Sequence, residues 1–142
     1  AYPGAPSAHE DAPALAVLGP FLKNGFLHRA IREQGGAYGG GAGWDSETGA
    51  FRFYSYRDPR LAETLADFDR SLEWLNEHAH EDRQVEEAVL GVIAEIDRPD
   101  SPAGEALRAF HGALSGRTPE ERRRFRRRVL DVGLKDLLGV AG

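Results

Sequence analysis

Apolar side chains recur at helical spacing through much of this chain and alternate with polar ones over one short stretch. Residues 11 to 34 carry a broad apolar face, within which Pro20 and Gly25 predict a kink or two helical pieces. A glycine pair, Gly35-Gly36, then ends the helix. The apolar face consists of Leu15, Leu18, Phe21, Leu22, Phe26, Leu27 and Ile31.

The residues after this helix predict a hairpin. Residues 50 to 57 alternate, with Phe51 and Phe53 on one side and Arg52 and Tyr54 on the other, which is typical of a strand. The glycine-rich residues 37 to 43 would form its partner strand, joined to it by a turn over residues 44 to 49.

Four more helices are predicted after the hairpin. Asp58-Pro59 has the form of an N-cap followed by proline in the first turn, so the first helix should run from there to about His78. The next is expected over residues 82 to 96, a third from Ser101-Pro102, and a fourth from the capping box at Thr118. Their inward stripes would be, in order, Leu61, Leu65, Phe68, Leu72 and Leu75; Val85, Val89, Val92 and Ile96; Leu107, Phe110 and Leu114; and Phe125, Val129 and Val132, widened by Leu130, Leu134, Leu137 and Leu138.

Strands followed by helices predict an α+β fold in which an antiparallel sheet packs against several helices. Because a hairpin alone is marginally stable, we expect these strands to join a larger sheet or to lie under the helices. Residues 1–12, rich in Pro, Gly and Ala, are expected to form a linker or open arm, with the domain over 13–142. The absence of Met and the irregular start favour a piece of a longer polypeptide.

Composition excludes several kinds of function. The net charge of −5 argues against general affinity for nucleic acids or anionic membranes, and the chain has no Cys for disulfides or thiolate chemistry. The arginine-rich residues 122 to 128 surround Phe125 of an apolar stripe, which favours a solvated or subunit-facing helix over a nucleic-acid site. No run approaches the roughly 18 apolar residues of a membrane span.

The segment from Arg32 to Trp44 is the most informative part of the chain, because glycine occupies positions 35, 36, 39, 40, 41 and 43. One interpretation is a helix C-cap followed by a hairpin arm. The other is a strand beside a bound ligand, with Arg32 and Tyr38 as polar anchors and the glycines making room for it. A phosphate loop is disfavoured, because these glycines follow a helix rather than precede one.

No zinc-binding string is present. Neither His-x-x-Glu-His nor His-Glu-x-x-His occurs, and the nearest pair, His78 and His80, is expected to be a surface pair. We therefore predict no catalytic residue and no metal ligand within this chain.

The run Phe-Leu-His-Arg-Ala-Ile-Arg-Glu-Gln-Gly-Gly-Ala-Tyr-Gly over residues 26 to 39 resembles the C-terminal half of insulinase/pitrilysin-family zinc metallopeptidases. Together with Phe-Arg-Phe-Tyr-Ser-Tyr-Arg-Asp-Pro over residues 51 to 59, it is most similar to the presequence protease branch. The resemblance extends through most of residues 14 to 138. It implies that Arg32 and Tyr38 reach a substrate held at a zinc site in the N-terminal half. It also implies that the first strands of the sheet lie upstream of Ala1, so the sheet would be incomplete here and its exposed edge would need a partner or other cover.

The resemblance therefore implies the substrate-binding C-terminal segment of a zinc metalloendopeptidase that degrades short unstructured peptides. Its substrate-binding residues would be Arg32, Gly36, Tyr38 and Gly39. Zinc would belong to the full-length enzyme and the segment alone would be inactive, so its partners would be the peptide and the N-terminal catalytic half or a zinc-carrying subunit, with no nucleic acid or membrane. The expected location is the cytoplasm for a bacterial source and an organelle matrix otherwise. The alternative is a non-catalytic scaffold or protein-binding domain of the same fold.

Overall fold

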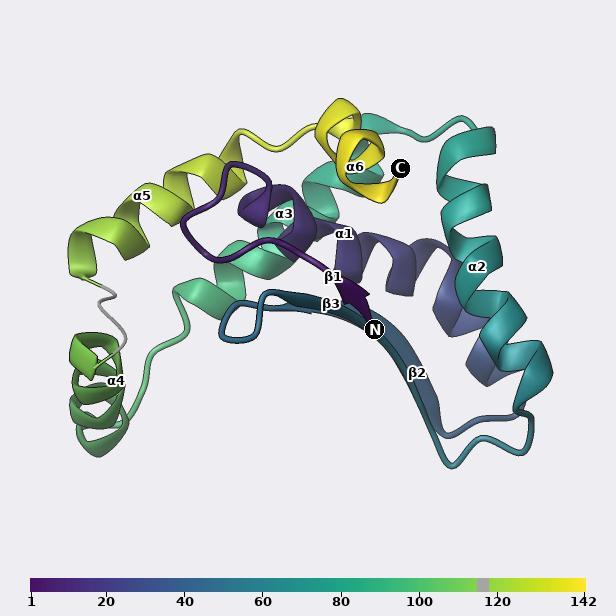
Figure 1. The fold of residues 1–142 in the computed structure, drawn as a ribbon, viewed down its shortest axis with the longest axis horizontal. Coiled ribbons are helices and arrows are strands. Elements are labelled where there is room, and N and C mark those ends of the chain that lie inside the picture. The colour runs from purple at the N-terminus through teal and green to yellow at the C-terminus, as the bar shows by residue number, and fades with distance from the viewer. Residues whose placement is uncertain (115–117) are drawn as a thin grey trace.

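Helix α1 (Ala12–Leu22) lies at the centre of the molecule in the computed structural model, which describes residues 1–114 and 118–142 (Figure 1). Nine of its 11 residues are buried, as expected for a helix that is apolar around its whole circumference. At Lys23 it continues directly into the π-helix η1 (Lys23–Gln34). The change of helix type falls between Pro20 and Gly25, so the predicted helix in two pieces is confirmed.

The sheet has three antiparallel strands in the order β1-β3-β2. Strands β2 (Gly39–Asp45) and β3 (Ala50–Tyr56) form the predicted hairpin. Trp44 and Asp45 had been assigned to the turn, but they pair with Phe51 and Ala50 and so belong to the strand. The α+β prediction is confirmed.

Strand β1 (Tyr2–Pro3) was not predicted, because two residues are too few to show an alternating pattern. It pairs with the first two residues of β3, and the indole Nε1 of Trp44 donates a hydrogen bond of 2.9 Å to the carbonyl oxygen of Ala5. The first residues of the chain therefore lie against the sheet, while the domain boundary proposed for residues 1–12 stays a prediction.

The hairpin has two different faces. Ala42 and Phe51 are buried on the face that packs against α1 and η1, and a Cβ atom added to Gly40 would lie 3.0 Å from Ile31. The opposite face, here called the outer face, carries Gly39, Gly41 and Gly43 on β2. These glycines are paired directly with Tyr56, Tyr54 and Arg52 on β3.

Helix α2 (Ala62–Glu77) corrects two predictions. It begins three residues after Pro59, because the Asp58 carboxylate accepts from the backbone N–H of Arg60 and shapes a turn instead of capping the helix. Leu75 is buried and Phe68 and Leu72 pack against the core, but Leu61 and Leu65 are exposed. The helix instead turns a partly polar stripe inward, made of Thr64, Asp67 and Ser71 with Leu75.

Three further helices pack around α1: α3 (Asp82–Ile96), α5 (Pro119–Leu130) and α6 (Leu134–Ala141). The predicted capping box at Thr118 is confirmed, since its hydroxyl accepts from the N–H of Glu121. One correction concerns the last helix, which was expected to be continuous but is divided at residues 131 to 133. The inward valines Val85, Val89 and Val129 are buried, and Val92, Ile96, Phe125 and Val132 pack against the core.

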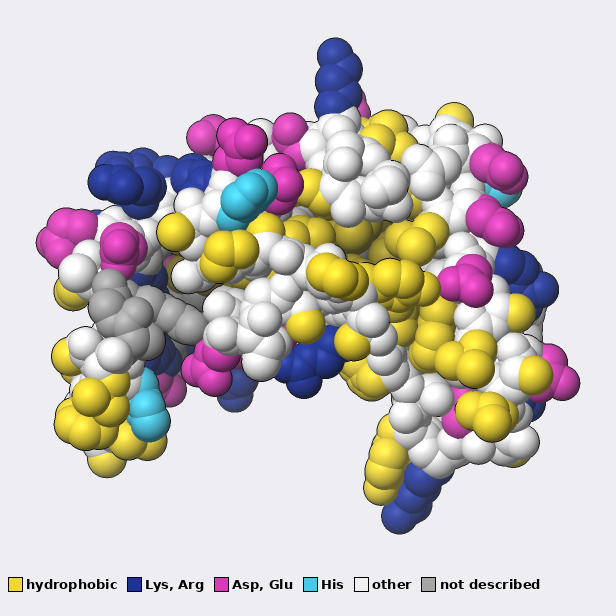
Figure 2. Space-filling view, in the orientation of Figure 1, with side chains coloured by type: hydrophobic (Ala, Val, Ile, Leu, Met, Phe, Trp, Pro, Cys, Tyr) yellow, Lys and Arg dark blue, Asp and Glu magenta, His cyan; other side chains and the backbone are white. Residues whose placement is uncertain are grey.

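Helix α4 (Pro102–Leu114) contradicts its predicted inward face, because none of its described residues is buried. Leu107, Phe110 and Leu114 are exposed, and Figure 2 shows apolar side chains gathered on this helix at the lower left. Helical periodicity predicts which face is apolar, but it does not show whether the same chain supplies something to cover that face. No helix in the described ranges is long and apolar enough to cross a membrane.

Candidate functional site

The turn between η1 and β2 joins the two predicted anchor residues. Gly35 ends the helix as predicted, and Gly36 takes the left-handed conformation, with φ of +78°, that glycine adopts without steric cost. The N–H of Gly36 donates to the carbonyl oxygen of Arg32, and the N–H of Ala37 donates to that of Ile31, both at 3.1 Å. The turn is therefore a fixed connection between the helix and the strand.

Tyr38 leaves this turn with its side chain in solvent, 68% exposed, although its backbone is held. Its N–H donates to the carbonyl oxygen of Tyr56 at 3.1 Å. Its ring meets the Tyr56 ring edge to face, with centroids 5.9 Å apart, and the guanidinium of Arg57 lies 6.0 Å from its centroid. The Tyr38 side chain is therefore not packed within the sheet.

Arg32 lies in the last turn of η1 and is also exposed. It does not pair with its neighbour Glu33, whose carboxylate lies 3.5 Å from Nδ1 of His28. Within the part of the chain that the structure describes, the Arg32 guanidinium has no hydrogen-bond or ion-pair partner. The turn connects the helix end that carries Arg32 to the strand start that carries Tyr38, and no hydrogen bond or cation–π contact joins these two side chains among the described residues.

Because β2 carries glycine at positions 39, 41 and 43, few side chains project from the outer face of the hairpin beside this turn. A Cβ atom added to Gly39 or Gly43 would meet nothing within 4 Å, while one added to Gly41 would approach Lys23 and Tyr54. A hollow of about 410 Å³ lies elsewhere, between α1, α5 and α6, and one of about 210 Å³ is lined by Gly43 and Tyr54. An exposed arginine, an exposed tyrosine and a strand whose outer face carries only glycine from Gly39 to Gly43 can together contact an extended polypeptide.

Comparison with known proteins decides the family. A family model described as the PreP C-terminal domain matches residues 7–142. The chain belongs to this family. It is 41% identical over 141 residues to the mitochondrial presequence protease of Kluyveromyces lactis. The aligned region covers 99% of this chain and 14% of the length of that protein.

Two other relatives agree with this assignment. The mitochondrial presequence proteases of Saccharomyces cerevisiae and Danio rerio are 40% and 39% identical over 97% and 96% of this chain. The chain covers 14% and 13% of their respective lengths. The resemblance to presequence proteases is therefore confirmed, and these peptidases are much longer than this PreP C-terminal domain.

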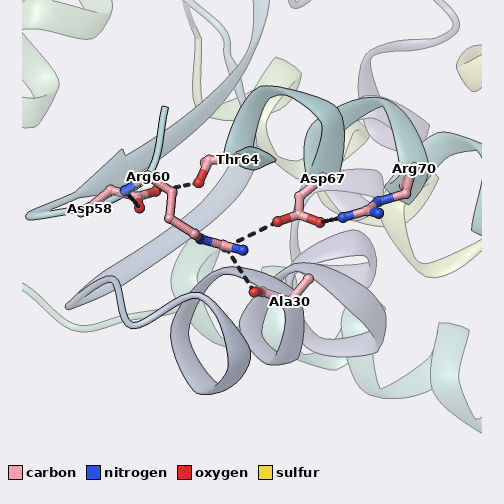
Figure 3. A network of polar contacts seen from close by, with 6 residues as sticks. All are labelled: Ala30, Asp58, Arg60, Thr64, Asp67 and Arg70. Carbon is pink, nitrogen blue, oxygen red and sulfur yellow. Dashed lines mark hydrogen bonds and ion pairs between the residues drawn. The ribbon is translucent and has the colours of Figure 1, made fainter. Parts of the chain in front are cut away.

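A polar network beside the turn was missed by the sequence analysis (Figure 3). Arg60 Nη2 donates to Oδ2 of Asp67 and to the carbonyl oxygen of Ala30, both at 3.1 Å, and Arg70 also pairs with Asp67. Asp67 is 1% exposed. A Cβ atom at Gly35 would overlap the Arg60 guanidinium. The network therefore holds the end of η1, from which Arg32 projects, against α2.

A carboxylate completes this network. Asp58 accepts from the Thr64 hydroxyl at 2.7 Å and from the Arg60 N–H at 2.9 Å. Partial desolvation raises the pKa of Asp58, but hydrogen bonds from Thr64, Arg60 and Ser55 and the charge of Arg60 outweigh it and hold the pKa below its usual value. The signal in the sequence that could have predicted this network is the helical spacing of Thr64, Asp67 and Ser71, which places three polar residues on one side of α2.

Several arginine side chains of helix α5 form hydrogen bonds or ion pairs with other residues of this chain. Arg126 pairs with Asp97, with Nε to Oδ1 at 2.8 Å, and Arg123 pairs with Glu120. Arg122 donates to the carbonyl oxygen of Ile96, and Arg128 donates to that of His9 at 2.8 Å. Guanidinium groups used in this way are less available for phosphates, which weighs against the nucleic-acid interpretation.

The described residues also carry no grouping of three or more His, Cys, Asp or Glu side chains that could hold a metal ion. His80 packs against Trp74, with centroids 4.4 Å apart, while its Nε2 lies 3.0 Å from the carbonyl oxygen of Leu75. Because the described residues offer no such set of ligands for zinc, we assign no metal-dependent chemical step to them.

Proposed function

We propose that this chain is the substrate-contacting C-terminal segment of a zinc-dependent metalloendopeptidase that degrades short unstructured peptides. The observation that carries the proposal is the pair of exposed side chains, Arg32 and Tyr38, held on either side of the Gly36 turn in a PreP C-terminal domain. Both side chains are exposed, so each can contact another molecule.

Peptide hydrolysis builds negative charge on the carbonyl oxygen of the scissile bond. A tyrosine hydroxyl or a guanidinium that is already in place stabilises this charge, and a guanidinium also fixes a carbonyl or carboxylate in one geometry. Arg32 and Tyr38 are proposed to contact the peptide near that bond. Gly36 and Gly39 leave space for the peptide backbone.

The zinc and the general base belong, in this proposal, to an N-terminal catalytic half or to a zinc-carrying subunit. The segment alone should be inactive. Incubation of the 142-residue chain with zinc and an unfolded peptide should give no turnover, and measurable turnover would contradict this part of the proposal.

The proposed location is an organelle matrix, which is supported by the mitochondrial names of the relatives. These relatives give no support to a bacterial cytoplasm.

The decisive experiment replaces Tyr38 with Phe and Arg32 with Ala in the full-length polypeptide. Loss of a transition-state donor should lower kcat/KM by about 100-fold or more, with zinc content and melting temperature unchanged. Tyr2→Phe and Arg83→Ala are matched controls, since Tyr2 donates to Asp69 and Arg83 pairs with Glu87 on α3. Full activity of both site variants would refute substrate contact. A full-length polypeptide that lacks zinc and turnover would instead support the non-catalytic scaffold.

A further inference from the structure

Arg57 occupies an unusual backbone conformation at the end of β3. With φ of 48°, it is the one non-glycine residue with positive φ in residues 1–114 and 118–142. A side chain in this left-handed region is strained, and such strain persists only where surrounding structure imposes it. Residues of this kind are enriched at functional sites, so the position of Arg57 beside Tyr38 calls for an explanation.

The neighbours of Arg57 hold this conformation from both sides. On one side, the carbonyl oxygen of Tyr56 accepts the N–H of Tyr38 at 3.1 Å. On the other, the Asp58 carboxylate accepts from the Thr64 hydroxyl and the Arg60 N–H. Glycine or asparagine would fit the left-handed turn more easily, so the backbone alone gives no reason for an arginine here.

The side chain supplies that reason. The Arg57 guanidinium lies 5.4 Å from the centroid of the Tyr56 ring and 6.0 Å from that of Tyr38. The two rings meet edge to face at an interplanar angle of 84°. Arg57 has no carboxylate partner in the described part of the chain. One cation therefore contacts both rings, an arrangement in which its charge is attracted to each.

Tyr38 has little else to hold its ring. The residue stands between the turn at Gly36 and the open strand position Gly39, and most of its side chain is in solvent. A hydroxyl that acts on a reacting carbonyl must be in place before the reaction, because a small displacement removes most of its effect.

We propose that Arg57 is a positioning residue that fixes the Tyr38 ring, together with Tyr56, for contact with the peptide substrate. The proposal rests on the proposed function of Tyr38. It assigns to Arg57 no direct contact with the substrate and no role in folding.

Arg57→Gly tests the proposal, because glycine removes the guanidinium and also relieves the backbone strain. In the full-length polypeptide, we expect a melting temperature equal to or above that of the parent protein and a kcat about two- to tenfold lower, with KM little changed. Arg57→Lys, which keeps a positive charge but not the planar group, should recover part of this loss. Unchanged kcat/KM in Arg57→Gly would overturn the proposal.

A double-mutant cycle with Tyr38→Phe separates positioning from an independent contact. If Arg57 acts through the Tyr38 hydroxyl, Arg57→Gly should cause no further loss of kcat in the Tyr38→Phe background. The same fold loss in both backgrounds would mean that Arg57 acts by itself, which would refute the proposal.

A spectroscopic measurement distinguishes this proposal from the proposed function. In NMR spectra of the 142-residue chain, Arg57→Gly should shift the ring resonances of Tyr38 and Tyr56 and increase the mobility of the Tyr38 ring, while Arg83→Ala should not. If Tyr38→Phe retains full activity, the proposed function fails whatever the spectra show. Unchanged Tyr38 resonances in Arg57→Gly would refute the positioning role even if Tyr38→Phe were inactive.

Discussion

Arg60 and Asp67 are joined by a hydrogen bond of 3.1 Å, and the same Arg60 nitrogen donates to the Ala30 carbonyl oxygen. Arg60→Ala would leave the buried Asp67 carboxylate with Arg70 as its one cationic partner among the described residues and would release the end of η1. We expect the free energy of unfolding in urea to fall by about 2–3 kcal/mol.

Arg83→Ala is the matched control for Arg60→Ala. Arg83 forms an i,i+4 pair with Glu87 in which both side chains are largely exposed. Its loss should change the free energy of unfolding by less than about 0.5 kcal/mol. Equal effects of the two substitutions would show that the network around Asp67 contributes no more than a surface ion pair.

The lowered pKa of Asp58 predicts how stability depends on pH. Because the pKa is lower in the folded than in the unfolded state, the stabilisation is complete above about pH 5 and is lost as the pH falls through about 4 and below. Asp58→Asn should therefore melt below the parent protein at pH 7, and this difference should shrink at pH 3. A difference that stays constant with pH would exclude Asp58 as the source.

Asp97 provides a comparison of a different kind. A hydrogen bond from Arg126, together with its charge, lowers the pKa of Asp97, but this pair is exposed. We expect the melting-temperature change caused by Asp97→Asn to vanish at about 1 M salt, where exposed charges are screened. The change caused by Asp58→Asn should persist, because hydrogen bonds from Thr64 and Arg60 are less sensitive to salt. Identical salt dependence for both variants would contradict this distinction.

Gly19 is required for the close approach of α1 to β2. A Cβ atom at this position would lie 2.8 Å from the Ala42 carbonyl oxygen and 2.8 Å from the Gly43 Cα, and both are backbone atoms. Gly19→Ala should therefore destabilise the protein by about 1–3 kcal/mol despite the higher helix propensity of alanine.

Gly91 is the control for Gly19, because it lies inside α3 with nothing within 4 Å of an added Cβ atom. Gly91→Ala should stabilise the protein by about 0.5–1 kcal/mol. Thermal unfolding of both variants would give shifts of opposite sign. Shifts of the same sign would mean that helix propensity, rather than contact with the strand, decides both positions.

Alanine substitutions at Gly36 and Gly39 provide a second comparison of this kind. An alanine at Gly36 has room, since its Cβ would lie 3.7 Å from Pro59, but φ of +78° is unfavourable and should cost about 1–2 kcal/mol. Gly39→Ala meets no atom and no strained backbone, so stability should be unchanged. If Gly39 leaves space for a peptide as proposed, Gly39→Ala should instead raise KM in the full-length enzyme. An unchanged KM would remove Gly39 from the site.

Sequence patterns predicted the elements whose apolar residues are covered by the chain itself. Helix α1 and the valine stripe of α3 are buried because their partners are present in the described structure. The pattern failed for α2, where arginines that precede and follow Asp67 allow a carboxylate to be buried in place of Leu65. It also failed for α4, in which none of the described residues is buried.

For the candidate site, the sequence led to Arg32 and Tyr38 because both stand beside the glycines. It did not lead to Arg57, since a left-handed backbone at an arginine and the contact of its side chain with two rings depend on how β2 and β3 pair. The role of these residues in substrate binding remains a prediction that the experiments above would test.

The central place of α1 has a consequence for biosynthesis. Within this segment α1 is translated before α5 and α6, which pack on it and follow it by roughly a hundred residues, and Arg128 donates to the His9 carbonyl oxygen across 119 residues. A nascent chain that has left the ribosome only as far as α3 therefore displays an apolar helix without two of its covering helices. Such a chain should depend on chaperones at this stage, and its core can close only after the last helix has emerged.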